Sequence, residues 1–173
     1  MGITDDSFTA VAEKEGPIVS VVGDTYRIVR RSEQTKGAYA LIDMLIPPKG
    51  GPGPHSHATF QEAFYIIGGE IKLITKEKTY TAKKGSYVNI PFNGSVHKFT
   101  NETDRTAHIL CFITPAGMEK MFLEIGKPVE ADTLLPIPQM TPEELKRLQS
   151  IAESMDRSCI RQTILINDKS NRR

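Results

Sequence analysis

The sequence predicts an all-β protein, an antiparallel sandwich or small barrel, followed by helices at its C-terminal side. Short segments that are apolar or that alternate between apolar and polar residues recur from residue 17 to residue 114. Glycine, proline and asparagine turn signals separate these segments, as in sandwiches and barrels. Beyond residue 115 the apolar residues recur at the spacing of a helix instead.

The first part of the chain predicts three strands after a polar segment. Residues 1–16 are polar, and we expect them to be loosely structured. The Gly23-Asp24 pair predicts a turn between the first two strands, and the proline and glycine residues of 47–54 prevent the third strand from continuing. The strands are expected at residues 17–22, 25–31 and 38–46.

The middle of the chain predicts six further strands. Gly68-Gly69 follows the apolar run AFYII and predicts a tight hairpin. The strands are expected at residues 62–67, 71–75, 78–81, 86–90, 97–100 and 106–114.

Two helices are expected after the strands. Met118, Met121, Phe122 and Ile125 recur at helical spacing, and Gly126 supplies a stop. The proline-rich residues 127–140 are expected to wrap the barrel, and the segment Thr-Pro-Glu-Glu at 141–144 is a helix start. The apolar stripe of this second helix consists of Leu145, Leu148, Ile151, Ala152 and Met155. The predicted organisation is an N-terminal segment (1–16), a barrel (17–115) and a helical extension packed on it (116–173).

Composition excludes several classes of function. The formal net charge is +1 with scattered basic residues, which argues against nucleic-acid binding. No apolar run has the length of a membrane span, and the N-terminal residues lack the order of a secretory signal, so we expect a cytoplasmic protein. Two cysteines make no disulfide framework, and no nucleophile elbow, Walker loop or dinucleotide fingerprint occurs.

Three of the four histidines lie in one arrangement with a carboxylate. His55 and His57 are two residues apart, a spacing that puts both imidazoles on one face of an extended chain. Glu62 opens the next apolar run, and His97 begins another predicted strand. Imidazoles and a carboxylate on inward-facing strand positions predict a site for a first-row transition metal.

These residues resemble the two motifs of the cupin superfamily. His55-x-His57, four residues, Glu62, six residues and Gly69 match the first motif, except that its leading glycine is one place off. The second motif matches from Gly85 through Pro91, Gly94 and His97 to Asn101, with one extra residue between Pro91 and Gly94. Both departures fall in turns. The segment FITPAGMEKMFLEIG also resembles single-domain, quercetinase-like cupins.

The resemblance implies a double-stranded β-helix, or jelly-roll barrel, with one divalent metal ion held by His55, His57, Glu62 and His97. Imidazole and carboxylate suit Fe, Mn, Ni, Cu, Co and Zn alike. It further implies a metal-dependent dioxygenase acting on a small enolic or aromatic substrate, with Glu62 as a general base. A non-enzymatic small-molecule or metal-binding cupin and a cupin isomerase are the alternatives.

The strand pattern also suggests which residues surround the metal. Phe64, Ile66 and Phe99 share the strand parity of Glu62 and His97, which predicts that they line the substrate pocket, and Phe60 and Gln61 border it. Cys111 is expected to be a small buried hydrophobe. His108 either touches the pocket or is a surface or rim residue, and Asp43 is either a pocket group or faces outward.

We expect a homodimer, because a single-domain barrel of this kind leaves unpaired sheet edges. The strand around residues 18–22 is the expected site of pairing with the partner.

Overall fold

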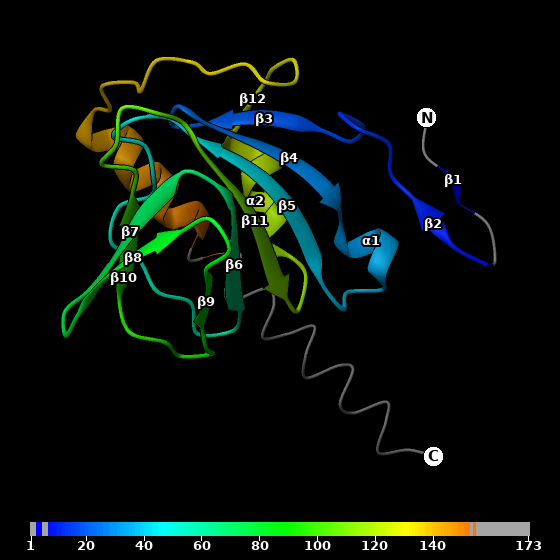
Figure 1. Cartoon of the computed structure of the whole chain (residues 1–173), viewed down its shortest axis with the longest axis horizontal. Coiled ribbons are helices and arrows are strands. Elements are labelled where there is room, and N and C mark those ends of the chain that lie inside the picture. Colours follow the sequence, from blue (N-terminus) through cyan, green and yellow to red (C-terminus); the bar gives the residue numbers. More distant parts are fainter. Residues whose placement is uncertain (1–2, 5–6, 153, 155–173) are drawn as a thin grey trace.

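A computed structural model describes residues 3–4, 7–152 and 154 of the chain (Figure 1). Two antiparallel sheets form the body. The larger has seven strands in the order β12 (Lys127–Pro128), β3 (Ile18–Val21), β4 (Asp24–Arg30), β5 (Ala40–Ile46), β11 (Ala107–Thr114), β6 (Gln61–Gly68) and β9 (Tyr87–Ile90). The smaller has three, in the order β10 (His97–Thr100), β7 (Glu70–Thr75) and β8 (Thr79–Lys83).

The core lies on one face of the large sheet. In β5 the inward side chains of Ile42, Met44 and Ile46 are buried, while the residues between them are half-buried. β11 repeats this alternation, with Ile109 and Cys111 buried completely. The period of two follows from the pleat of a strand, which sends successive side chains to opposite faces. Because the smaller sheet covers the same core, the predicted all-β cupin jelly roll is confirmed.

The prediction of a hairpin at Gly68-Gly69 is wrong. β6 belongs to the large sheet and β7 to the small one, so the chain changes sheets at this point instead of folding back. Gly69 has a φ of +68°, and a Cβ there would lie 2.9 Å from the Cα of Ala107. The glycine is therefore required by a tight corner between sheets, whose local sequence looks the same as that of a hairpin.

The turn between β3 and β4 lies one residue earlier than predicted. Val22 and Gly23 have φ values of +53° and +96°, the signs of a two-residue hairpin turn with both central residues left-handed. Asp24 therefore belongs to β4, where it is only 3% exposed. A buried carboxyl at a strand start could not be predicted from the turn propensity of aspartate alone.

The N-terminal segment contains structure that the polar composition did not predict. Strands β1 (Ile3–Thr4) and β2 (Thr9–Ala10) pair with each other and lie to one side of the larger and the smaller sheet (Figure 1). A short helix, α1 (Ser32–Thr35), also follows β4. Strand β3 is paired on both sides, because β12 pairs with its residues Val19 and Ser20. The edge expected to receive a partner is thus covered there within the chain.

The first C-terminal helix is α2 (Met118–Ile125), as predicted. Phe122 is buried and meets Tyr26 edge to face, with ring centroids 5.0 Å apart. Gly126 ends the helix without a left-handed conformation, since its φ is −75°. It is a close-approach glycine instead, because a Cβ would lie 2.6 Å from the Cβ of Val19.

The second helix covers residues 142–152 and 154 of the described chain. Leu145 of the expected apolar stripe is 49% exposed, while Leu148 and Ile151 are half-buried. Met155 lies outside the described residues. Packing of the whole extension on the barrel therefore stays a prediction. Within the part of the chain that the structure describes, none of the helices has the length and apolar character needed to cross a membrane.

Candidate metal centre

Four side chains converge between the two sheets. Each of His55, His57, Glu62 and His97 offers one donor atom, and all four atoms lie within 4.8 Å of one another. The two first histidines lie in the loop between β5 and β6, Glu62 is the second residue of β6, and His97 is the first residue of β10. The cluster thus joins the large sheet, the small sheet and the loop between β5 and β6.

Backbone pairing fixes the loop that carries the first two histidines. The amides of His55 and His97 each donate to the other's carbonyl at 2.9 Å. The amide of Lys49 donates to the carbonyl of Asn101, and the amide of Asn101 donates to the carbonyl of Gly50. A Cβ at Gly51 would lie 2.3 Å from the carbonyl oxygen of Phe99. The glycines of the motif therefore let this loop lie directly against β10.

Two imidazoles have their tautomers set by the backbone. The Nδ1 of His55 lies 2.8 Å from the carbonyl of Gly53, and the Nδ1 of His97 lies 3.1 Å from the carbonyl of Ser95. A carbonyl oxygen only accepts, so each Nδ1 donates its hydrogen. The neutral rings then carry their lone pairs on Nε2. This is the arrangement that metal-binding histidines adopt.

The carboxylate of Glu62 has two different oxygens. Oε2 lies 3.7 Å from Nε2 of His97 and 3.9 Å from Nε2 of His57, distances too long for hydrogen bonds. Among the described residues, neither Oε2 of Glu62 nor Nε2 of His97 has a hydrogen-bond partner, although both atoms are buried. Oε1, in contrast, accepts a hydrogen bond from the thiol of Cys111 at 3.4 Å.

The ionisation of the cluster follows from burial and from mutual contact. Burial opposes charge on Glu62, but the neighbouring His97, His57 and His55 outweigh it and hold the Glu62 pKa below its usual value. Burial opposes charge on His97 as well, yet the Glu62 carboxylate and the Ser95 carbonyl raise the His97 pKa. Burial lowers the pKa of His55 and raises the pKa of the Cys111 thiol well above its usual value.

These features fit a transition-metal ion. Buried donors without hydrogen-bond partners cost free energy, and a cation placed among them removes that cost. Three imidazoles and one carboxylate suit any of several first-row divalent ions. Four protein donors leave one or two positions free on a five- or six-coordinate ion. The cluster is therefore compatible with a metal site, as the sequence predicted.

The predicted wall residues lie on the inner face as the strand parity required. Phe64, Ile66 and Phe99 are each at most 2% exposed, and the rings of Phe64 and Phe99 meet edge to face at 5.3 Å. Phe60 is equally buried, and its ring centroid lies 6.1 Å from that of His57. Gln61 belongs to β6 and is half-buried. Phe60 is thus a packed neighbour of the histidines rather than an exposed loop residue.

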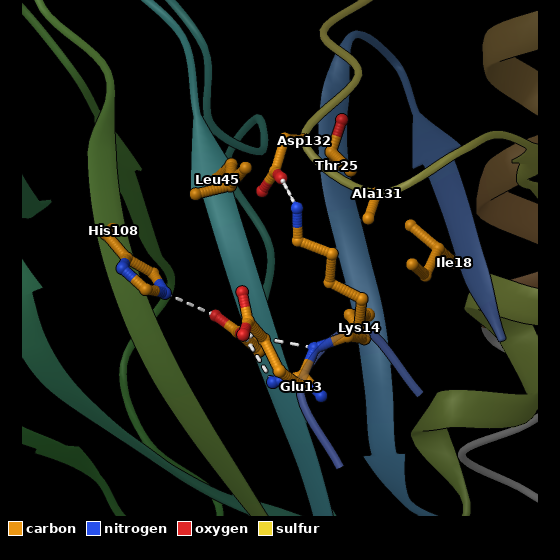
Figure 2. Close-up of a pocket in the computed structure, with 10 residues that line it drawn as sticks. Glu13, Lys14, Ile18, Thr25, Leu45, His108, Ala131 and Asp132 are labelled. Carbon is orange, nitrogen blue, oxygen red and sulfur yellow. Dashed lines mark hydrogen bonds and ion pairs between the residues drawn. The ribbon is translucent and has the colours of Figure 1, made fainter. Parts of the chain in front are cut away.

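Asp43 and His108 lie away from the four donors and contact each other, so both take the outward-facing alternative. They meet on the outer face of the large sheet, where Nε2 of His108 lies 2.5 Å from Oδ1 of Asp43 (Figure 2). Arg27 donates to the other oxygen of the same carboxylate through Nε at 3.2 Å and Nη2 at 2.7 Å. These three residues line a cavity of about 180 Å³, whose lining also includes the ion pair of Lys14 with Asp132.

Sequence reasoning missed a buried polar pair beside the metal-site loop. The Tyr26 hydroxyl donates to Oδ2 of Asp24 at 3.2 Å, and the Gly51 amide donates to Oδ1 at 3.2 Å. Burial raises the Asp24 pKa to about 7, partly offset by these two hydrogen bonds. The available signal was that Asp24 and Tyr26 share strand parity with Ile28, which is an apolar core residue.

Comparison with known proteins agrees with this architecture. The family model for the cupin domain matches residues 42–113, which include all four donors. A quercetin 2,3-dioxygenase from Bacillus subtilis is 23% identical over 116 residues, 67% of this chain but only 34% of that relative. The chain therefore spans about a third of that enzyme's length.

Solved structures share the fold at low sequence identity. An ectoine synthase from P. lautus aligns with a TM-score of 0.54 and 19% identity, covering 73% of this chain and 90% of that one. KdgF from Halomonas sp. aligns with a TM-score of 0.52 and 12% identity, covering 60% and 89%. The cupin-domain match over residues 42–113, which carries the four donors, supports a cupin superfamily protein, and these solved structures agree with it in fold.

Proposed function

We propose that this protein is a metal-dependent oxidoreductase, a dioxygenase that acts on a small enolic or aromatic substrate. One observation carries the metal-binding part: Oε2 of Glu62 and Nε2 of His97 are buried, face each other at 3.7 Å, and have no hydrogen-bond partner among the described residues. A divalent ion, of Fe, Mn, Ni, Cu, Co or Zn, satisfies both atoms at once. The limited similarity to a quercetin 2,3-dioxygenase supports the oxidative part.

In this proposal each residue has a defined role. His55, His57, Glu62 and His97 hold the ion, and the carbonyls of Gly53 and Ser95 keep Nε2 of two histidines directed at it. The ion would supply Lewis-acid activation of an enolic oxygen and electron transfer between the substrate and dioxygen. Phe60, Phe64, Ile66 and Phe99 make the surroundings apolar, which suits a flat substrate and excludes water.

Glu62 is the residue that we propose for proton transfer. Its lowered pKa keeps the carboxylate ionised near neutral pH, so that it accepts a proton from an enol hydroxyl. The same low pKa makes it a weak base. Glu62 would therefore deprotonate effectively only a hydroxyl whose own pKa a bound ion had lowered.

Metal analysis of the purified protein, followed by oxygen uptake with flavonols, catechols and 1,3-diketones, tests the proposal. We expect one ion per chain and oxygen consumption with at least one chelating enol. Replacing Glu62 with Gln keeps an oxygen near the ion and removes the base. It should lower turnover more than substrate binding, and an equal loss of both would argue against the base.

The alternatives predict different outcomes of the same experiment. If the metal-loaded protein binds chelating enols tightly but consumes no oxygen, it is a small-molecule binding cupin. If the protein binds no metal and instead interconverts isomers of a substrate, it is a cupin isomerase. The latter reading requires acid–base residues other than metal ligands in the core, and Asp24 with Tyr26 is the candidate pair that the structure offers.

We also propose that the protein is a cytoplasmic homodimer. Its binding partner would be a small-molecule substrate rather than a nucleic acid or a membrane. Two chains of 19.2 kDa give a particle of roughly 38 kDa, which light scattering after size exclusion measures directly. A monomer at micromolar concentration would refute the dimer without bearing on the metal site.

A further inference from the structure

Cys111 lies on the inner face of the large sheet, diagonally across from Glu62. In the antiparallel pair of β11 and β6, Cys111 is opposite Phe64 and Ile113 is opposite Glu62. Diagonal neighbours on one face lie within reach of a side chain. Ile109 and Ile113, the other inward residues of this part of β11, are fully buried and apolar. Of the three inward residues Ile109, Cys111 and Ile113, only Cys111 therefore has a side-chain hydrogen to donate.

The thiol contacts one oxygen of the Glu62 carboxylate and leaves the other alone. The Sγ of Cys111 lies 3.4 Å from Oε1, within the range of a thiol hydrogen bond. A carboxylate only accepts, so the thiol is the donor. Oε2 faces Nε2 of His97 and of His57 at 3.7 and 3.9 Å. Oε1 thus lies beside a thiol donor from β11, whereas Oε2 lies beside the imidazoles.

We propose that Cys111 is a positioning residue that makes Glu62 a ligand through a single oxygen. With Oε1 held by the thiol, only Oε2 would be available to a bound ion, and the coordination position that a second carboxylate oxygen could take would stay free. This inference rests on the proposed metal binding. It gives the buried cysteine a role beyond filling space, because an alanine or a valine would fill the position without a hydrogen to donate.

The test replaces Cys111 with Ser, which keeps a donor, and with Val, which keeps the bulk but has none. Co²⁺ is the probe, because its visible spectrum reports coordination number and calorimetry gives its affinity. We expect Cys111→Ser to bind Co²⁺ within about 3-fold of the natural protein, whereas Cys111→Val binds about 10–100-fold more weakly. The Val variant should also show a weaker visible band, as expected when both carboxylate oxygens bind and the coordination number rises.

Two controls separate positioning from packing. Ile109→Val changes a core side chain of the same strand that lies two residues from Cys111, and it should leave the Co²⁺ affinity and spectrum unchanged. In a Glu62→Gln background the difference between Ser and Val at position 111 should disappear, because the carboxylate that the thiol orients is gone. Melting temperatures of the metal-free variants show whether each one folds.

The outcomes distinguish this inference from the proposed function. If the natural protein fails to bind Co²⁺ or any other first-row ion, the metal proposal itself fails. If the natural protein binds Co²⁺ and folded Cys111→Val binds it equally well with the same spectrum, then Cys111 is only a core residue. A loss of affinity in Ile109→Val as large as that in Cys111→Val would likewise reduce the effect to packing.

Discussion

The two faces of the large sheet each hold a carboxylate beside a histidine, but they treat it in opposite ways. On the outer face, Asp43 accepts hydrogen bonds from both Arg27 and His108 at 2.5 to 3.2 Å. On the inner face, Oε2 of Glu62 has two imidazoles nearby and no hydrogen bond among the described residues. Both oxygens of the outer carboxylate thus have hydrogen-bond donors, whereas Oε2 of the inner one has none among the described residues.

This difference arises from how the donors are distributed. The guanidinium of Arg27 brings a fixed positive charge and several N–H groups to Asp43, which leaves no requirement for a further cation. Around Glu62, the Nδ1 hydrogens of His55 and His97 are used by backbone carbonyls, so lone pairs rather than hydrogens face the carboxylate. The direction in which the histidine hydrogen points therefore distinguishes the two faces of the sheet.

The largest expected effect is the loss of metal on removing an inner histidine. His57→Ala should lower metal affinity by more than about 100-fold, because even the loss of a group that only orients a ligand costs 10–100-fold. The matched control is His108→Ala on the outer face, which should keep one ion per chain. Elemental analysis after dialysis measures both. Full occupancy in His57→Ala, or equal loss in the two variants, would break the distinction between the faces.

Metal affinity should also depend on pH in a direction set by His97. Its pKa is raised above 6.5, and a proton on Nε2 competes with the ion, so affinity should fall as the pH drops below that raised pKa. Each competing proton weakens binding by about tenfold per pH unit. In the metal-free protein the sign is opposite. The raised pKa stabilises the fold below pH 6.5, and that contribution is lost as the pH rises through the folded-state value.

Calorimetric titrations of the ion between pH 5.5 and 8 measure this dependence. His108→Ala is again the control, because the outer histidine does not contact the cluster and its removal should leave the profile unchanged. A metal affinity that is independent of pH across this range would mean that the ion does not have to displace a proton from His97.

Asp24, another buried carboxyl group, extends the comparison because burial is the largest influence on its pKa. Its pKa of about 7 lies above the ordinary value of 3.8, so the folded protein keeps a proton that the unfolded chain loses. Stability from this group is fully present below pH 3.8 and is lost as the pH rises to about 7. The limiting slope is about 1.4 kcal/mol per pH unit.

Asp24→Asn does not titrate and keeps the size of the side chain and one acceptor oxygen, while its amide nitrogen replaces the oxygen that accepts from Tyr26. We would measure urea unfolding of the two proteins at pH 4.5, 5.5 and 7.5. The free energy of unfolding of the variant, relative to that of the natural protein, should increase as the pH rises and stop increasing above about pH 7. A stability difference that is the same at all three pH values would show that Asp24 does not titrate in this window.

The smallest expected effect is the loss of an outer-face ion pair. Asp43→Asn should lower the free energy of unfolding by about 1–3 kcal/mol, because Arg27 and His108 lose a shared, partly buried acceptor. Asp104→Asn is the matched control, since the Asp104 side chain is 96% exposed and its pair with Arg105 should contribute little. Metal content should not change in either variant. Reduced metal content in Asp43→Asn would mean that the two faces are coupled.

The sequence by itself predicted the barrel and the four residues of the cluster. Strand alternation gave the inward parity of Phe64, Ile66 and Phe99, and all three are buried. The two motifs predicted that His55, His57, Glu62 and His97 lie close together, and their donor atoms do converge. Periodicity and motif spacing are local properties, so they can be read from a few neighbouring residues.

Only the tertiary structure decided what lies between distant strands. Gly68-Gly69 has the local sequence of a hairpin, yet it connects two sheets because β11 rather than β7 pairs with β6. The hydrogen bond from Cys111 to Glu62 spans 49 residues of sequence and depends on the register of that same pair. The meeting of Asp43 with His108 spans 65. Such contacts depend on strand order and register, which the hydrophobic pattern of a single strand does not contain.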